Sequence, residues 1–131
     1  MFQIDAMSRK PVYEQIIEQL EKFVLKGILT ADSQLPSVRN LSSTLSINPN
    51  TIQKAYSELD RKGIIYSVPG RGCFVTANAK EILSTYKREE LEDFIVLMKS
   101  LALAGVTKEQ ILECVYNVFD HKEVKNDDSN Q

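Results

Sequence analysis

The sequence predicts a mainly α-helical chain that contains one small β-hairpin. Apolar residues recur at steps of three and four in five separate stretches, which indicates five helices. Residues that favour helix ends flank these stretches. One Gly-rich segment separates two short runs of β-branched and aromatic residues, as in a hairpin. With 131 residues, the chain can form one modest domain, or a small domain with an appendage.

The first predicted helix begins at Pro11, a residue that suits a first helical turn. Its apolar residues are spaced for one helical face: Val12, Ile16, Leu20, Phe23 and Val24. Gly27 follows and can end the helix. The connector ILTADSQLP, residues 28–36, then leads to Pro36, which keeps the chain extended up to the next helix.

Two short helices come next, and each begins with a residue that can cap it. Ser37 is the predicted N-cap of the second helix, whose apolar residues are Val38, Leu41 and Leu45. Asn48 is the predicted N-cap of the third helix, with Pro49 as its first helical residue. Its predicted inward stripe is Ile52, Ala55, Tyr56 and Leu59.

The segment IIYSVPGRGCFVT, residues 64–76, reads as two strands joined by Pro69-Gly70-Arg71-Gly72. Three helices followed by a hairpin, with a tight turn between the second and third helices, form a winged helix-turn-helix layout. The predicted fold class is therefore mainly α with a small β-hairpin: a winged helix-turn-helix domain followed by a C-terminal two-helix dimerisation domain. The predicted ranges are 1–77, 78–121 and a disordered tail at 122–131.

The back half contains a long amphipathic helix from Asn78 to Gly105 and a second helix that begins with a capping box at Thr107 and Gln110. Two helices alone cannot bury so long an apolar face. The sequence therefore predicts a homodimer interface on the long helix. Its predicted residues are Ile82, Tyr86, Leu91, Phe94, Ile95, Met98 and Leu101.

The motifs expected of an enzyme are missing from the sequence. GxSxG, P-loop and GxGxxG patterns do not occur, and a single histidine, His121, cannot support a catalytic triad. We therefore predict no catalytic residues, no cofactor and no metal site. No apolar run approaches the roughly 18 residues that a membrane span needs, and no secretory signal begins the chain. Cys73 and Cys114 are expected to be reduced thiols of a cytoplasmic protein.

Charge is distributed unevenly along the chain. The net charge is −2. Residues 1–77 carry 9 Lys and Arg against 7 Asp and Glu, whereas residues 78–131 carry 7 against 11. The front half is thus mildly basic and the back half acidic, and this asymmetry favours a front half that contacts phosphate.

The outward face of the third helix can contact DNA, because the second helix of a helix-turn-helix enters the major groove. The polar residues on or near this face are Asn50, Gln53, Lys54 and Ser57. Taken alone, they are better explained as a solvated polar surface. Arg39 can hold a phosphate or a base, or pair with Asp32 or Glu58 as an ordinary surface charge. Arg71, at the hairpin tip, can enter a minor groove, although a plain β-turn also favours its Gly neighbours.

Four blocks of the sequence also resemble one protein family. PVYEQI, LPSVRNLS, NPNTIQKAYSELDRKGII and GRGCFV are similar to the DNA-binding domain of GntR-type bacterial transcription regulators, and the short back half is similar to the YtrA-like subfamily. The resemblance implies DNA contacts from Ser37, Arg39, Asn48, Asn50, Thr51, Gln53, Lys54, Gly70 and Arg71. The chain departs from many relatives at Pro49 and Gln53, where they carry Arg, so no base preference is transferred. Cys73 stands where Thr is more common, which leaves a redox role open.

The resemblance implies a homodimeric repressor of a palindromic operator, often one that controls a neighbouring transporter operon. Half-sites would lie about one helical turn (~10 base pairs) or a multiple of it apart. The 54 residues after residue 77 are too few for the effector domains of larger relatives. A small-molecule effector would then bind at the dimer interface or between domains. Two other classes remain: a protein–protein adaptor with a winged helix, and a sensing module that has lost DNA binding.

Overall fold

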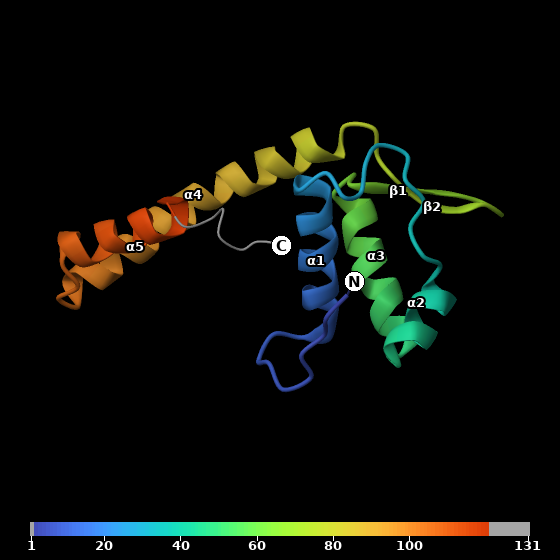
Figure 1. The fold of residues 1–131 in the computed structure, drawn as a ribbon, viewed down its shortest axis with the longest axis horizontal. Coiled ribbons are helices and arrows are strands. Elements are labelled where there is room, and N and C mark those ends of the chain that lie inside the picture. Colours follow the sequence, from blue (N-terminus) through green and yellow to red (C-terminus); the bar gives the residue numbers. More distant parts are fainter. Residues whose placement is uncertain (1, 121–131) are drawn as a thin grey trace. The chain divides into compact units, whose positions relative to one another are not determined.

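A computed structural model describes residues 2–120, which form five helices and one two-stranded sheet (Figure 1). The elements are α1 (Val12–Leu25), α2 (Val38–Leu45), α3 (Pro49–Arg61), β1 (Ile65–Val68), β2 (Gly72–Val75), α4 (Ala79–Leu103) and α5 (Lys108–Asp120). Their kind and order confirm the predicted fold class. The tail predicted at 122–131 and His121 lie outside the described residues.

The chain divides into two compact units, Met1–Arg88 and Glu89–Gln131. The first ten residues of α4, up to Arg88, belong to the front unit, and Ala79 and Leu83 are buried in its core. The division into domains at residue 77 stays a prediction. Within the described residues, no helix is both long and apolar enough to cross a membrane.

Local capping starts α2, α3 and α5, as the sequence predicts. Ser37 Oγ accepts the backbone N–H of Asn40 at 3.0 Å, and Asn48 Oδ1 accepts that of Asn50 at 2.8 Å. Gln110 donates its N–H to Thr107 Oγ1 at 3.1 Å, while Thr107 donates its own to Gln110 Oε1 at 2.8 Å. These bonds satisfy backbone donors that a helix start otherwise leaves free.

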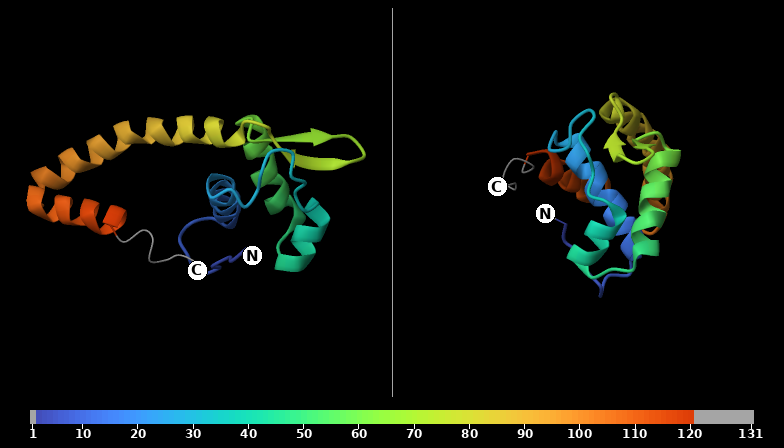
Figure 2. Two further views of the ribbon diagram at one scale, coloured as in Figure 1. Left: turned by 45° about the horizontal axis from the view of Figure 1, so that its top comes forward. Right: turned by 90° about the vertical axis from the view of Figure 1, so that its right-hand side faces the viewer.

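The core of the front unit forms where α1, α3 and the sheet meet (Figures 1 and 2). Ile16 of α1 and Ile52 and Leu59 of α3 are fully enclosed, each 0% exposed. Burying an aliphatic side chain of this size contributes about 1.5–3 kcal/mol. The inward stripe of α3 predicted from its spacing is thereby confirmed, since Ala55 and Tyr56 are buried as well.

The connector before α2 pairs with the hairpin, a feature that the sequence analysis did not predict. Leu35 donates its N–H to the Cys73 carbonyl at 2.9 Å, and Val75 donates to the Ser33 carbonyl at 2.8 Å. Gln34 forms an antiparallel bridge with Phe74. A short third segment therefore supports β2 on the side opposite β1, and it ties the hairpin to the approach to α2.

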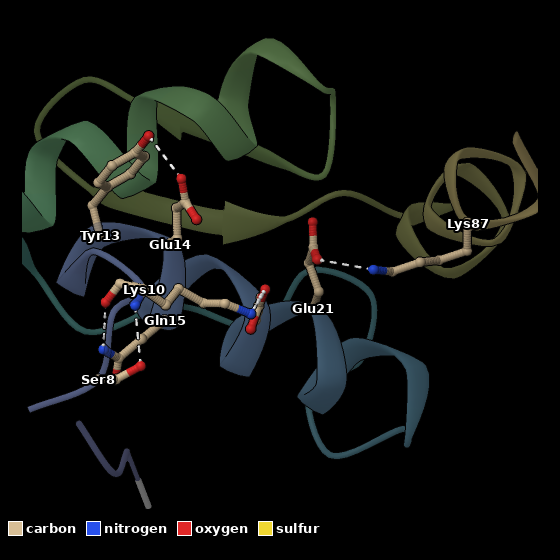
Figure 3. A network of polar contacts seen from close by, with 8 residues as sticks. Ser8, Lys10, Tyr13, Glu14, Gln15, Glu21 and Lys87 are labelled. Carbon is tan, nitrogen blue, oxygen red and sulfur yellow. Dashed lines mark hydrogen bonds and ion pairs between the residues drawn. The ribbon is translucent and has the colours of Figure 1, made fainter. Parts of the chain in front are cut away.

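The N-terminal segment is held against α1 by a buried glutamine, Gln15. Gln15 is 8% exposed, and its Nε2 donates to the carbonyls of Asp5 and Lys10, both at 2.9 Å. Its Oε1 accepts the N–H of Asp5 at 2.8 Å. All of the amide's bonding groups are thus used, as a buried polar side chain requires. Figure 3 shows Gln15 beside Lys10 at the start of α1.

Glu21 of α1 is a buried carboxylate, 5% exposed, that two lysines contact. Lys62, at the end of α3, lies 3.2 Å from Glu21 Oε2, and Lys87 of α4 lies 3.8 Å from Oε1. Figure 3 shows the approach of Lys87. A carboxylate at this depth is stable only when it is paired. This cluster therefore joins α1, the end of α3 and the start of α4 within the front unit.

We expect Glu21→Gln to lower the free energy of unfolding by about 1–3 kcal/mol, because it removes the charge that both lysines share. Glu18→Gln is the matched control on the same helix, since the Lys10–Glu18 pair is solvent-exposed on both sides and such pairs contribute about 0–1 kcal/mol. Urea unfolding at one fixed protein concentration measures both. Equal losses in the two variants would contradict the role assigned to the buried pair.

Candidate nucleic-acid interface

Helix α3 presents two chemically different faces. Ile52, Ala55 and Leu59 are 0% exposed, which fixes the rotation of the helix against the core. Asn50, Gln53 and Ser57 are exposed on the other side. A helix rotated in this way can place polar side chains against another surface without losing any of its core contacts.

The two capping side chains keep hydrogen-bonding capacity for a ligand. Ser37 and Asn48 are exposed, and each uses an oxygen to accept a backbone N–H. A serine hydroxyl can still donate its own hydrogen, and the Asn48 amide can still donate two.

Gln53 bonds along the helix surface in the described structure. Its Nε2 donates to Ser57 Oγ at 3.1 Å, one turn further along α3. Bidentate contact with adenine needs both the amide oxygen and the amide nitrogen. The bond to Ser57 uses one of the two N–H donors of Gln53, so the other donor and the amide oxygen stay available to a base, and both side chains are exposed.

Arg39 projects from the first turn of α2 and is exposed. The two acidic residues considered as its partners bond elsewhere: Asp32 Oδ1 accepts the Tyr66 hydroxyl at 2.8 Å, and Glu58 pairs with Arg61. Hydrogen bonding from Arg61 also lowers the pKa of the Glu58 carboxyl. No ion pair or hydrogen bond of the Arg39 side chain is found within residues 2–120, so its guanidinium donors remain available.

Tyr56 joins α3 to the segment that carries Arg39, a role that sequence reasoning missed by assigning Tyr56 only to the core. Its hydroxyl donates to the Pro36 carbonyl at 2.7 Å. Burial raises the pKa of this hydroxyl, so it stays protonated and able to donate at neutral pH. The residue type could have predicted this bond, because a buried tyrosine hydroxyl usually has a hydrogen-bond partner.

Lys54 has a partner on α1. Its Nζ lies 4.0 Å from the centroid of the Tyr13 ring, a cation–π geometry. The Tyr13 hydroxyl in turn donates to Glu14 at 3.3 Å, as Figure 3 shows. The Lys54 side chain thus contacts α1 in this structure. A DNA contact by Lys54 stays a prediction, as do the contacts predicted for the other site residues.

The hairpin ends in a tight turn that exposes Arg71. The N–H of Arg71 donates to the Val68 carbonyl at 2.9 Å, and Gly70 has φ +78°. Proline at the second position of a turn and a positive φ at the third are typical of a type II turn. Glycine adopts that φ without strain. The Arg71 side chain is therefore presented at the tip, beside a residue without a side chain.

A surface groove of about 340 Å³ lies between α3 and the hairpin. Gln53, Ser57 and Arg61 line it from the helix, together with the carboxylate of Asp60. Cys73 lines it from β2, with its Sγ 3.4 Å from Ser67 Oγ. The groove thus runs from the outward face of α3 to the hairpin. The redox role left open for Cys73 stays untested.

A second surface, on the back unit, is apolar. Five of the predicted interface residues lie there, and Leu91, Phe94 and Ile95 are 59%, 43% and 36% exposed. Ile82 and Tyr86 belong to the front unit instead, where Ile82 is packed against the core. Their assignment to the interface stays a prediction.

Helix α5 adds to this apolar surface, which the sequence analysis placed on the long helix alone. No residue of α5 is buried, and Tyr116, Val118 and Phe119 are 58–64% exposed. A groove of about 400 Å³ runs between the two helices of the back unit. It is lined by Phe94, Met98, Leu101, Ile111, Cys114, Val115, Val118 and Phe119. The helical spacing of Ile111, Val115 and Val118, at steps of four and three, could have predicted this surface.

Within the described part of the chain, no group of three or more His, Cys, Asp or Glu side chains could hold a metal ion. The chemistry available on and beside the outward face of α3 includes hydrogen bonding by amides and hydroxyls, together with the exposed guanidinium groups of Arg39 and Arg71. That set matches the donors and acceptors used to contact base edges and phosphates.

Comparisons with known proteins bear on the same region. Residues 12–75 match the family described as "Bacterial regulatory proteins, gntR family". The HTH-type transcriptional repressor YtrA of Bacillus subtilis (strain 168) is 42% identical over 122 residues, which are 90% of this chain and 92% of that protein.

Solved structures are similar as well. YtrA from Sulfolobus acidocaldarius, described as a GntR-family transcription factor, is 33% identical, with a TM-score of 0.62, 77% of this chain covered and 97% of that chain. The DNA-binding domain of AraR, solved in complex with operator ORX1, is 31% identical, with a TM-score of 0.51, 58% of this chain covered and 93% of that chain.

Proposed function

The chain belongs to the GntR family of bacterial regulatory proteins, and we propose that it is a homodimeric repressor that binds a palindromic operator. Members of this family are transcription regulators with a DNA-binding domain, which also confirms the expectation that the chain is not an enzyme. Repression is proposed because the Bacillus subtilis relative is a repressor. It would act by blocking access of polymerase to the promoter.

The observation that carries the proposal is a pair of exposed arginines without ion pairs, one before and one after the polar helix in the chain. Arg39 lies before α3 in the chain, and Arg71 lies at the wing tip after it. No ion pair of either arginine side chain is found in residues 2–120. DNA binding therefore does not have to break an ion pair at Arg39 or Arg71. Between them, Asn50 and Gln53 offer the amide groups that suit adenine.

We assign the contacts in three groups. Asn50, Thr51 and Gln53, in the first turns of α3, would meet base edges in the major groove. Ser37, Arg39 and Asn48, together with the positive end of α3, would hold phosphates. Gly70 and Arg71 would enter the adjacent minor groove, where arginine is favoured. Lys54 would contact a phosphate only by leaving the ring of Tyr13.

The homodimer is proposed from the apolar surface of the back unit. Isolated helices as short as α5, with 13 residues, are marginal in water. Their apolar side chains gain about 1.5–3 kcal/mol each when fully buried. A second copy of the same unit supplies a matching apolar surface, and a two-fold axis makes the contact self-complementary. The same axis would relate two half-sites about 10 base pairs, or a multiple, apart.

The cellular setting follows from the proposed operator. A protein that binds chromosomal DNA in a bacterium would work in the cytoplasm. We propose a neighbouring transporter operon as its target, on the resemblance to the YtrA-like subfamily. A small-molecule effector, where one exists, would bind at the dimer interface or between the domains.

We expect Arg39→Ala and Gln53→Ala to weaken DNA binding in different ways. Loss of a phosphate contact by Arg39→Ala should lower affinity for all sequences and reduce the salt slope of log K by about 1. Loss of a base contact by Gln53→Ala should relax preference at particular base pairs by about 1–3 kcal/mol. Fluorescence anisotropy between about 50 and 200 mM salt measures both, on duplexes that the wild-type chain selects from a random library.

Lys22→Ala is the control for the lost charge, because Lys22 lines a groove beside the N-terminal segment on α1, together with Asp5 and Gln19. It should leave affinity and salt slope unchanged. If the wild-type chain selected no DNA sequence at low salt, the proposed function would be wrong, and an adaptor role for the winged helix would become the better account.

We expect Phe94→Asp to convert the dimer to monomers, because it places a charge among apolar side chains that a second copy would cover. Sedimentation velocity measures the mass, and operator affinity should fall in parallel. Ser100→Asp is the matched control: it adds the same charge to the same helix at an exposed residue that does not line the apolar groove. A Phe94→Asp protein that sediments as the wild type does would refute the assigned interface.

A further inference from the structure

The wing tip is held by a side chain from outside the hairpin. Gln34, in the connector before α2, donates from Nε2 to the carbonyl oxygen of Arg71 at 2.9 Å, across 37 residues of sequence. We propose that Gln34 is a positioning residue, which fixes the backbone of Arg71 so that its guanidinium is presented to DNA. This inference rests on the proposed role of Arg71 in the minor groove.

Backbone pairing brings Gln34 to this place. Gln34 forms an antiparallel bridge with Phe74, and its neighbour Leu35 donates to the Cys73 carbonyl at 2.9 Å. On the other side, the Val75 N–H donates to the Ser33 carbonyl at 2.8 Å. These bonds fix the Gln34 backbone beside β2. Its side chain is long enough to extend from there along the strand to the turn.

The turn leaves space for the Gln34 amide at Gly72. A Cβ built on Gly72 would lie 2.9 Å from Gln34 Nε2, closer than real Cβ atoms approach other groups. Gly72 also has φ +118°, a conformation that other residues rarely adopt. A side chain at this position would displace the amide and strain the backbone. The contact of Gln34 with Arg71 therefore depends on glycine at position 72.

Both backbone polar groups of Arg71 are consequently bonded. Its N–H donates to the Val68 carbonyl at 2.9 Å, and its carbonyl accepts the Gln34 amide. The side chain alone remains free to move. A backbone that is already ordered loses less conformational entropy when the arginine binds, so the preformed tip should favour affinity.

The chemistry of the contact defines the variants that test it. A carbonyl oxygen needs a donor, and the amide nitrogen is the only donor of a glutamine side chain. Gln34→Met keeps the length of the side chain without a donor. Gln34→Glu keeps its shape but puts carboxylate oxygens against the carbonyl and adds a negative charge near the DNA. Gln34→Glu should therefore weaken binding more than Gln34→Met does.

The experiment is a double-mutant cycle on the full chain, with anisotropy measured on duplexes that the wild-type chain selects from a random library. We expect Gln34→Met to weaken binding about three- to tenfold, which lies in the lower half of the coupling range for contacting residues. In an Arg71→Ala background the same substitution should change affinity less than about twofold, because the residue that it positions is gone.

A second measurement separates positioning from general stability. Replacing A·T pairs by G·C pairs at the flanks of the selected site widens the minor groove and should weaken the wild-type chain, which inserts arginine there. Gln34→Met should lose most of this dependence, as Arg71→Ala does. Gln19→Met is the matched control, because Gln19 also donates its amide to a backbone carbonyl, that of Gln3 in the N-terminal segment. It should behave as the wild type.

The outcomes distinguish this inference from the proposed function. If Arg71→Ala weakens binding but Gln34→Met does not, the positioning role is wrong and the proposed function stands. Equal losses from Gln34→Met in both backgrounds would also overturn it, since Gln34 would then act without Arg71. If neither substitution affects binding, the role of the wing in the proposed function fails, and the inference fails with it.

Discussion

The burial of one stripe of α3 against α1 is the constraint on which the rest of the front unit depends. Ile52 and Leu59 have no exposed surface, so α3 cannot rotate without opening the core. This fixes which residues face outward, and Asn50 and Gln53 are among them. The bond from Tyr56 to the Pro36 carbonyl then aligns the approach to α2 with the same helix. One packing surface thus determines the geometry of the polar face.

The features that could be predicted from the sequence are those that neighbouring residues specify. Ser37 and Asn48 cap helices through bonds to residues three and two positions away, respectively. A short stretch of sequence is therefore enough to predict them. The hairpin likewise depends on Pro69 and Gly70 between two β-rich runs. The polar face of α3 followed from its apolar spacing. That this face contacts DNA, and is not simply solvated, could be predicted only from Arg39, Arg71 and the family resemblance together.

The features that could not be predicted arise from contacts between distant residues. Gln34 reaches Arg71 only because the connector pairs with β2, and nothing in ILTADSQLP by itself indicates a strand. Glu21 looks like an exposed helix residue until α3 and α4 bring Lys62 and Lys87 to it. Ile82 shares a spacing with Phe94, yet it packs against the front core. Spacing indicates that a face is apolar, and the tertiary fold decides what covers it.

A net charge of −2 is compatible with this surface because charge acts locally. Two carboxylates that could neutralise Arg39 are already occupied within the front unit, Asp32 by the Tyr66 hydroxyl and Glu58 by Arg61. A phosphate that approaches Arg39 therefore does not have to displace an acidic partner. The acidic excess of the chain lies after residue 77, in sequence assigned to self-association. The lack of an ion pair to Arg39 within residues 2–120, rather than an excess of bases, is what suits this mildly charged domain to contact a phosphate.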